Sequence, residues 1–318
     1  MHFGISIVAD ERMNMYQLER AFRRSGAVLR QNQCGEIEYL TFPLLEETGC
    51  VEHLFSTRLG GVSKGEFASM NLSFQRGDAP ECVLENYRRI ASILKVSLED
   101  MVTSKQTHTT NIKLITKEDK GKGVIKPLDY DDIDGLITQE EGIVLVTSYA
   151  DCVPLYFVDP IKRAIGLAHS GWRGTVQQMG ACMVRAMEEQ FGSKPEDIRA
   201  AIGPSICQDC YEVSEDVAQA FRESLAGMED IVQEICDSGC YKDTKPFCKV
   251  LEDGREPGKY QLDLWLANLI ILRKAGIPLK QIAVTDICTC HNPDYLFSHR
   301  ASKGKRGALE AFLMLRES

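Results

Sequence analysis

Two histidines and one cysteine lie at positions where the sequence pattern leads toward a ligand. His169 ends the apolar run Ala-Ile-Gly-Leu-Ala-His, and Ser-Gly-Trp-Arg-Gly-Thr follows it. This pattern predicts a strand that leads into a helix, and backbone amides at a helix N-terminus bind anions. Cys152 lies between two apolar, β-branched runs, and His108 directly precedes another. The other four of the six histidines lie in the amino-terminal tail, inside a predicted strand or near the carboxyl end.

Two imidazoles and a thiolate are ligands that suit zinc. No fourth ligand is evident nearby in the sequence, so such a site would leave one coordination position open to water, as catalytic zinc sites do. The spacing of His108, Cys152 and His169 matches no short zinc motif. Two alternatives therefore stay open: a buried cysteine beside two hydrogen-bonded histidines, and a cysteine hydrolase in which Cys152 is the nucleophile and a histidine is its base.

Asp151 is the carboxylate nearest in sequence to one of these residues. It could act catalytically as a general base, or it could orient a metal-bound histidine. An aspartate at this position also suits a turn between two strands, so these interpretations stay open.

The composition limits the class of protein. The chain has 318 residues, a hydrophobic fraction of 44% and a formal net charge of -9. This charge argues against sequence-independent binding of nucleic acid or of an anionic membrane. We see no apolar run of the roughly 18 residues that a membrane helix needs and no signal peptide, so we expect a cytoplasmic protein. The twelve cysteines are then expected to stay reduced.

The predicted elements mix strands and helices without a regular alternation. We expect residues 1–35 to form an N-terminal extension, with a short helix over 13–24 and a linker at 31–35, and residues 36–318 to form one catalytic domain. We interpret residues 228–258 as irregular. The pattern favours an α+β fold with mixed sheets. Strands are predicted at 39–45, 52–57, 111–116, 135–138, 143–149, 153–158, 164–168 and 282–287, and helices at 80–94, 175–191, 215–225 and 262–275.

Several motifs occur together in one order. They are Phe55-Ser-Thr-Arg-Leu-Gly-Gly-Val-Ser63, Met70-Asn-Leu-Ser73, Gln106-Thr-His108, Asp134-Gly135, Ala150-Asp-Cys-Val-Pro154, Ala168-His-Ser-Gly-Trp-Arg-Gly-Thr175, Ile202-Gly-Pro204, Cys210-Tyr-Glu-Val213 and Phe297-Ser-His-Arg300. From about Tyr39 to Phe312 the chain thereby resembles the laccase-domain, or polyphenol oxidase, family, whose YfiH-like members are regarded as purine nucleoside phosphorylases.

The resemblance implies a fold, a metal and an activity. The family's fold is a four-layer α+β arrangement with mixed sheets. Its members bind zinc, with copper also reported, at the positions of His108, Cys152 and His169. Their activities are phosphorolysis of adenosine, inosine, guanosine and methylthioadenosine, together with adenosine deamination. We therefore expect purine nucleosides and phosphate as substrates, and the sequence leaves open whether the protein is a monomer or a homodimer.

Four further residues are candidates for binding the substrate of such a reaction. Arg58, beside two glycines, and Arg173, at the predicted helix start after His169, could hold phosphate through bidentate hydrogen bonds. Asn71 could bind substrate or cap a turn. Gln106 could orient His108 or bind substrate. For both arginines an exposed or structural role remains the alternative.

Two cysteine groups and one basic run have a second interpretation. Cys207-Gln-Asp-Cys210 and Cys288-Thr-Cys290-His291 have spacings found in structural zinc sites. We interpret them as buried thiols, because the family does not require both pairs, and a structural zinc site is the alternative. The run from Lys303 to Arg306 could be a phosphate patch, but we interpret it as a solvated loop.

Two other functions can be weighed against the sequence. A copper oxidase of the laccase type needs many histidines and paired His-x-His motifs, whereas this chain has six histidines and no His-x-His. A non-catalytic binding module has no direct support in the sequence. The nucleobase-deaminase signature, His-x-Glu followed by Pro-Cys-x-x-Cys, is absent as well, so any deamination must use a different architecture.

Overall fold

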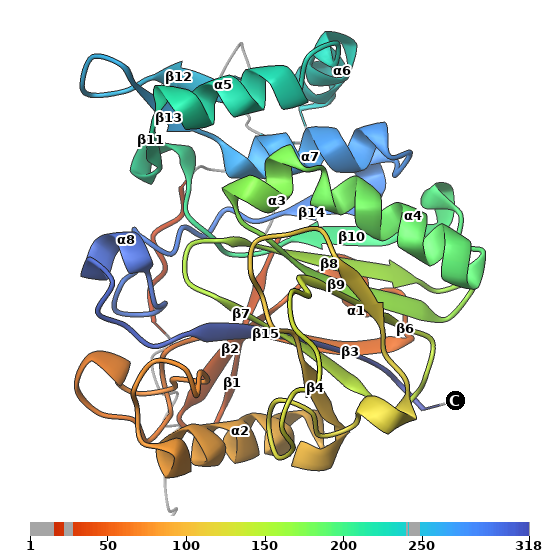
Figure 1. The fold of residues 1–318 in the computed structure, drawn as a ribbon, viewed down its shortest axis with the longest axis vertical. Helices are drawn as coiled ribbons and strands as arrows, with labels where there is room; N and C mark the ends of the chain where they lie inside the picture. Colours follow the sequence, from red (N-terminus) through yellow and green to blue (C-terminus); the bar gives the residue numbers. More distant parts are fainter. Residues whose placement is uncertain (1–15, 22–27, 240, 242–248, 318) are drawn as a thin grey trace, which may run out of the picture.

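Two six-stranded sheets lie face to face in the computed structural model, which describes residues 16–21, 28–239, 241 and 249–317 (Figure 1). Most neighbouring strands are antiparallel, and β4–β7, β5–β6 and β10–β14 are parallel. The first sheet has the order β1 (Arg30–Cys34), β2 (Ile37–Thr41), β3 (Val51–Ser56), β15 (Leu309–Leu315), β7 (Val144–Tyr149) and β4 (Met101–Thr103). The second has the order β14 (Ile282–Val284), β10 (Arg199–Ile202), β8 (Val153–Asp159), β9 (Ala164–Ser170), β6 (Gly135–Thr138) and β5 (Ile112–Leu114).

Helices cover the outer face of each sheet and complete four layers (Figure 1). Helix α2 (Pro80–Leu94) packs on the first sheet, and α3 (Trp172–Val176), α4 (Met179–Phe191) and α7 (Leu264–Lys274) cover the second. Beyond α7 lie α5 (Glu215–Ser224), α6 (Glu229–Ser238) and a small antiparallel sheet of β11 (Glu212–Ser214), β13 (Lys259–Leu262) and β12 (Leu251–Asp253). Two one-turn helices, α1 (Pro43–Glu46) and α8 (His299–Ser302), lie in connections. The predicted α+β fold with mixed sheets in one domain is confirmed.

The core follows from the period of each element. Side chains alternate across a strand, so Leu54 packs toward α2 while Phe55 packs between the two sheets. Strands buried on both faces are therefore continuously apolar, as in the buried run of β8. The layer between the sheets contains Phe55, Leu145 and Leu313 of the first sheet and Tyr156, Ile165 and Leu167 of the second.

Two helices show how the sequence sets helix limits. Pro80 occupies the first turn of α2, where its missing amide costs nothing, and Lys95 ends the helix in the left-handed conformation. The side chain of Asp263 caps α7 by accepting a hydrogen bond from the amide of Leu266. Residues 264–272 of α7 are all buried, because this helix lies between the second sheet and the outer layer. Within the described residues, no helix is both long enough and apolar enough to span a bilayer.

Some predicted elements differ from the observed ones. The predicted strand 39–45 ends at Thr41, because Pro43 begins α1. The predicted helix 175–191 is divided between α3 and α4 by Gln178, which has a φ of 64°. The interpretation of residues 228–258 as irregular was wrong, since they contain α6 and β12, although residues 240 and 242–248 lie outside the described part.

The amino-terminal residues are tied to the rest of the fold. The segment interpreted as a linker belongs to β1, which pairs with β2 from Arg30↔Thr41 to Cys34↔Ile37. Of the helix predicted at 13–24, the described residues 16–21 form no helix, and the others lie outside the described part. In this segment Arg20 forms an ion pair of 2.6 Å with the buried Asp286.

A buried amide on α2 generates a prediction about stability. Asn86 donates to the hydroxyl of Ser63 and to the carbonyls of Ser69 and Asn71, and it accepts from the amide of Val62. Asn86→Ala should leave these buried groups unpaired and lower the free energy of unfolding by about 3 kcal/mol. Urea denaturation would measure this loss.

The matched control lies on the exposed side of the same helix. Arg88→Ala removes a 56% exposed side chain with one ion pair of 3.6 Å, so its effect should stay within about 0.5 kcal/mol. Equal losses in the two variants would contradict the structural role of Asn86.

Candidate metal centre and its pocket

The three predicted metal ligands come from three separate elements and converge. His108 lies in the loop between β4 and β5, Cys152 follows β7, and His169 lies on β9. Their potential ligand atoms all lie within 4.8 Å of one another. The register of β8 with β9 places Pro154 opposite His169, so the residue just before β8 lies beside the same strand.

The surroundings of the three side chains leave room for an ion but not for another side chain. A Cβ added at Gly171 would lie 3.0 Å from both the sulfur of Cys152 and Cδ2 of His108. The two imidazole rings are nearly perpendicular, with centroids 5.0 Å apart. Two imidazoles and a thiolate at this spacing fit a zinc-type ion with one open position.

A buried carboxylate, Asp134, orients the two histidines. Its Oδ1 lies 2.8 Å from Nδ1 of His169 and accepts from the amide of His108 at 3.1 Å. Its Oδ2 accepts from the amides of Thr107 and Thr109. These bonds leave Nε2 of His169 free to face a metal and hold His108 in a left-handed conformation, with a φ of 68°. In the sequence, Asp134 stood out only as part of the motif Asp134-Gly135.

The charges of the centre favour ionised forms. Burial would raise the pKa of Cys152, but His169 and a hydrogen bond from His108 outweigh it and lower that pKa to about 6. For His169 the effects are reversed: burial would lower its pKa, but Cys152 and Asp134 raise it to about 9. Cys152 is therefore favoured as a thiolate, which is the form that binds metal or acts as a nucleophile.

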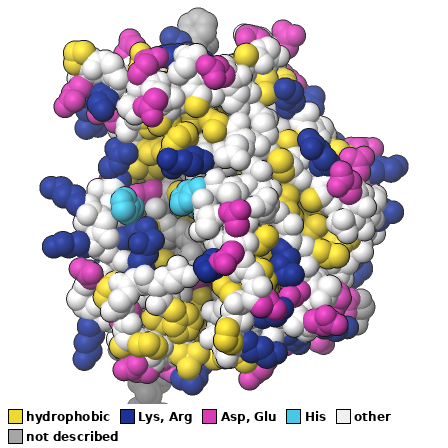
Figure 2. Space-filling view, in the orientation of Figure 1, with side chains coloured by type: hydrophobic (Ala, Val, Ile, Leu, Met, Phe, Trp, Pro, Cys, Tyr) yellow, Lys and Arg dark blue, Asp and Glu magenta, His cyan; other side chains and the backbone are white. Residues whose placement is uncertain are grey.

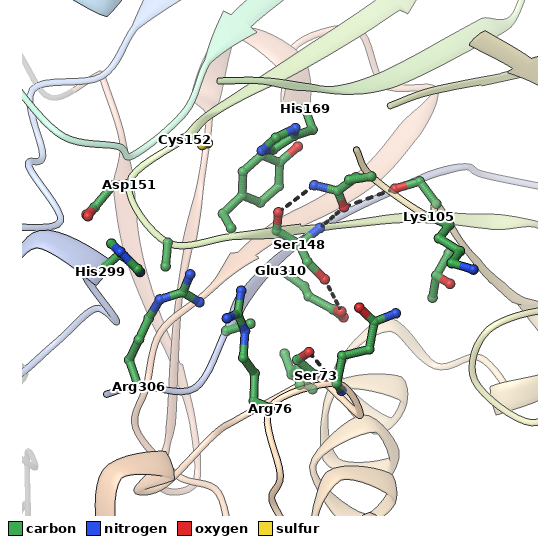
Figure 3. A pocket seen from close by; sticks show the side chains of 18 of the residues that line it. Ser73, Arg76, Lys105, Ser148, Asp151, Cys152, His169, His299, Arg306 and Glu310 are labelled. Carbon is green, nitrogen blue, oxygen red and sulfur yellow. Dashed lines mark hydrogen bonds between the residues drawn. The ribbon is translucent and has the colours of Figure 1, made fainter. Parts of the chain in front are cut away.

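The three residues open onto a pocket of about 580 Å³. Figure 2 shows Lys, Arg and His side chains gathered around a hollow on this face of the molecule. In Figure 3, Cys152 and His169 lie at one end, and Arg76 and Arg306 extend into the same space as Glu310. The chain as a whole is acidic, so this gathering of cations favours an anionic group of a substrate.

Arg306 has the properties of an anion-binding residue. It is 8% exposed, and its guanidinium donates to the carbonyl of Gly307. Among the described residues it forms no ion pair, and its Nε has no hydrogen-bond partner. Burial, and secondarily Arg76, lowers the pKa of Arg306 to about 10, so it stays charged at neutral pH. The interpretation of 303–306 as a solvated loop was therefore wrong for Arg306.

Glu310 is a buried acid in the pocket wall. Its Oε1 accepts from the hydroxyls of Tyr87 at 2.6 Å and Ser148 at 2.8 Å. Its Oε2 has no partner among the described residues. Burial raises the pKa of Glu310 to about 8, against the lowering effect of the two hydroxyls, so the carboxyl group is mostly protonated at neutral pH.

Two predicted residues lie in the pocket lining but are held by the protein. Asp151 has a φ of 86°, and its carboxylate accepts from the hydroxyl of Thr289 at 2.6 Å and the amide of Arg300 at 2.7 Å. Gln106 exchanges hydrogen bonds with the amide and the carbonyl of Ser148. Both side chains therefore fix the wall beside the candidate ligands.

The other three predicted residues lie outside the lining. Arg58 donates to the carbonyls of Ala68 and Pro293, so its guanidinium connects two loops of the protein. Asn71 is buried and connects its loop to the amide of Ala308. Arg173 is exposed and lies over the ring of Trp172.

Sequence reasoning missed Glu310, assigned no role to Asp134, and preferred a solvated loop to a phosphate patch for the run that contains Arg306. Glu310 is an acid inside the apolar run Leu-Glu-Ala-Phe-Leu-Met-Leu, and a charge in a buried strand is a signal that could have found it. The basic run was the only signal for Arg306, and it did not distinguish this buried arginine from the exposed Lys303 and Lys305.

The fold and the site define a class: an α+β protein with a two-histidine, one-cysteine candidate metal centre at the end of a basic pocket. A family described as multi-copper polyphenol oxidoreductase laccase matches residues 52–316, and the chain belongs to this family. The purine nucleoside phosphorylase YlmD of Bacillus subtilis (strain 168) is 35% identical over 265 residues, which are 83% of this chain and 88% of that protein.

Two further comparisons agree with this assignment. The adenosine deaminase RL5, from an unknown prokaryotic organism, is 32% identical over 77% of this chain and 87% of that protein. The crystal structure of the Bacillus licheniformis hypothetical protein YfiH superposes with a TM-score of 0.79 and 32% identity, covering 90% of this chain and 99% of that one. The resemblance stated from the sequence is confirmed.

The raised pKa of Glu310 generates a prediction about pH and stability. The folded state holds the proton up to pH about 8, whereas the carboxyl of the unfolded chain loses it near the ordinary glutamate pKa of 4.5. The wild-type protein should therefore lose stability as pH rises between these values, and Glu310→Gln should not share this loss. Between pH 4.5 and pH 8, the free energy of unfolding of the variant minus that of the wild type should increase by roughly 4 kcal/mol.

Urea denaturation of both proteins at several pH values between 5 and 8 would measure the difference. Glu189→Gln, at an exposed position on α4, is the control and should show no such trend. A difference between Glu310→Gln and wild type that is constant with pH would contradict the raised pKa.

Proposed function

We propose that the chain is a zinc-dependent purine nucleoside phosphorylase, acting on adenosine, inosine, guanosine and methylthioadenosine, with adenosine deamination as a second activity. The observation that carries this proposal is that the candidate metal ligands and Arg306, which forms no ion pair among the described residues, open onto one pocket. The names of the relatives, phosphorylase and deaminase, support the same substrate class.

The metal is assigned to His108, Cys152 and His169, with Asp134 behind them. A zinc ion bound to these residues would supply Lewis-acid chemistry at the end of the pocket. The alternative metal is copper. However, the two groups of potential ligands among the described residues contain only three histidines, too few for the several coppers of laccase chemistry.

Phosphate is assigned to the basic end of the pocket. Arg306 is buried and lacks an anionic partner among the described residues, and Arg76 is an exposed cation in the same lining. A phosphate placed between them gains charge-assisted hydrogen bonds in a site partly removed from water. This arrangement replaces the roles first expected for Arg58 and Arg173.

The purine must leave as a stabilised base when phosphate attacks C1′ of the ribose. Glu310 is suited to this step, because its protonated carboxyl can donate to a ring nitrogen of the departing base. Trp172 and Tyr211, which also line the pocket, offer aromatic faces for stacking on the purine. The carboxylate of Asp151 is already paired on both oxygens, so we assign it a positioning role.

A cysteine hydrolase is the second candidate. Cys152 has a lowered pKa and two histidines beside it, which are also the features of a nucleophile with its base. The two functions differ in what they require, because the phosphorylase needs inorganic phosphate and the hydrolase needs water alone.

Removing the central ligand tests the proposal. Purified wild-type protein with adenosine or inosine should release adenine or hypoxanthine only when phosphate is present. Cys152→Ala should lower this rate by about a thousandfold or more and should lose metal from the centre. Chromatography of the products, with metal analysis of both proteins, would measure this. Inosine formed from adenosine without phosphate would establish the second activity.

Cys182→Ala is the matched control, because it removes a half-buried thiol on α4 away from the pocket. It should keep both activity and metal. If metal-loaded wild-type protein turns over no nucleoside, the phosphorylase proposal fails. Activity that persists without metal and is abolished by alkylation of Cys152 would favour the hydrolase.

The assignment of phosphate to Arg306 generates a separate prediction. Arg306→Gln should raise the KM for phosphate by about 10-fold to 100-fold, because one or two charge-assisted hydrogen bonds are lost. The KM for the nucleoside should change much less. Steady-state kinetics with each substrate varied in turn would measure both constants.

Lys305→Gln is the control, since Lys305 is the exposed neighbour in the same basic run. It should leave both constants nearly unchanged. If Arg306→Gln leaves the KM for phosphate unchanged and Arg58→Gln raises it, phosphate binding would be assigned to Arg58, as the sequence first suggested.

A further inference from the structure

Four potential metal ligands form a second cluster outside the lining of the pocket. They are Cys207, Cys210, Cys288 and His291, and their ligand atoms all lie within 4.8 Å of one another. The two pairs are far apart in the sequence and meet because each follows one strand of the parallel pair β10–β14. Cys207 and Cys288 are buried, and Cys210 and His291 are half-buried.

The spacing fits a single tetrahedral ion. In a tetrahedral site with metal–sulfur bonds of about 2.3 Å, ligand atoms are about 3.8 Å apart. The sulfur of Cys207 lies 4.0 Å from Nδ1 of His291, and all pairs stay below 4.8 Å. The thiolates around an iron–sulfur cluster must lie farther apart, since several iron and sulfide atoms separate them. A mononuclear site is therefore favoured.

The backbone around the cluster stabilises a negatively charged sulfur. The amide of Cys207 donates to the sulfur of Cys288 at 3.3 Å. The amide of Cys210 closes a turn onto the carbonyl of Cys207. Backbone amides aimed at thiolates also support the ligands of structural metal sites.

We propose that Cys207, Cys210, Cys288 and His291 hold a second, structural zinc ion. Three thiolates and one imidazole are a complete ligand set for such an ion, with no position left for water. This differs from the centre at Cys152, which has three protein ligands and faces the pocket. The interpretation of these cysteines as buried thiols is thereby replaced by its alternative.

The ion would tie together the segments that support the pocket wall. Next to Cys207, the amide of Ile206 donates to the carbonyl of Asp151. Next to Cys288, the hydroxyl of Thr289 donates to the carboxylate of the same Asp151. Asp151 directly precedes Cys152, so a metal that joins the two segments fixes the approach of the chain to the catalytic centre. The site therefore has a structural role in the proposed enzyme.

The test counts zinc per chain in the full-length protein. After purification with reductant and zinc, wild type should hold about two ions and Cys152→Ala about one. His291→Ala should also hold about one, and His291→Cys should restore the second by completing a four-cysteine set. Cys182→Ser is the control thiol and should keep both ions. Mass spectrometry of the metal and of the protein would give the counts.

Cobalt substitution identifies which ion remains. Cobalt in Cys152→Ala should show strong thiolate charge-transfer absorption from three sulfurs, about threefold stronger than in His291→Ala, where the remaining site has one sulfur. Cys152→Ala alone keeps the proposal falsifiable if the other variants do not fold. The proposal is overturned if Cys152→Ala holds no metal, if His291→Ala keeps both ions, or if native protein contains a disulfide among Cys207, Cys210 and Cys288.

Discussion

One buried carboxylate, Asp134, connects the parts of the chain on which the candidate centre depends. It lies just before β6, accepts the amides of Thr107, His108 and Thr109, and binds Nδ1 of His169. Its own carbonyl accepts the amide of His169 at 2.8 Å. Burial alone would raise the pKa of Asp134, but these partners lower it, so the carboxylate stays charged inside the protein. Asp134 thereby fixes His108, whose backbone is in the left-handed region, and His169 of β9 relative to each other.

The pocket lies where the chain passes from one sheet to the other. Strand β7 belongs to the first sheet and β8 to the second, and the short connection between them contains Asp151 and Cys152. Because both strands are buried and paired on each side, this connection has little freedom. The second cluster of cysteines lies behind the same connection, and the hydrogen bonds of its neighbouring residues end on Asp151. The two metal centres that we propose therefore share one rigid support.

Much of the fold and part of the site could be predicted from the sequence. Long periodic segments such as 80–94 gave correct helices, because their apolar spacing and their end residues agree. Residues 31–35 and 228–258 were misinterpreted, since edge strands and short polar helices lack a strong apolar period. The convergence of His108, Cys152 and His169 followed from motifs. The burial of Arg306 did not, because it depends on how the chain folds over the pocket after α8.

Two buried ionisable side chains, Arg306 and Glu310, line the pocket. Arg306 has an unpaired Nε and Glu310 an unpaired Oε2 among the described residues, and each costs stability while it lacks a partner. In the proposed enzyme, a bound phosphate would offset the buried charge of Arg306, and a purine base would receive the proton of Glu310. The unfavourable burial is then offset only in the loaded pocket, so binding energy is concentrated at the two groups that the proposed reaction uses. A pocket that served only to close the core would have filled these positions with apolar side chains.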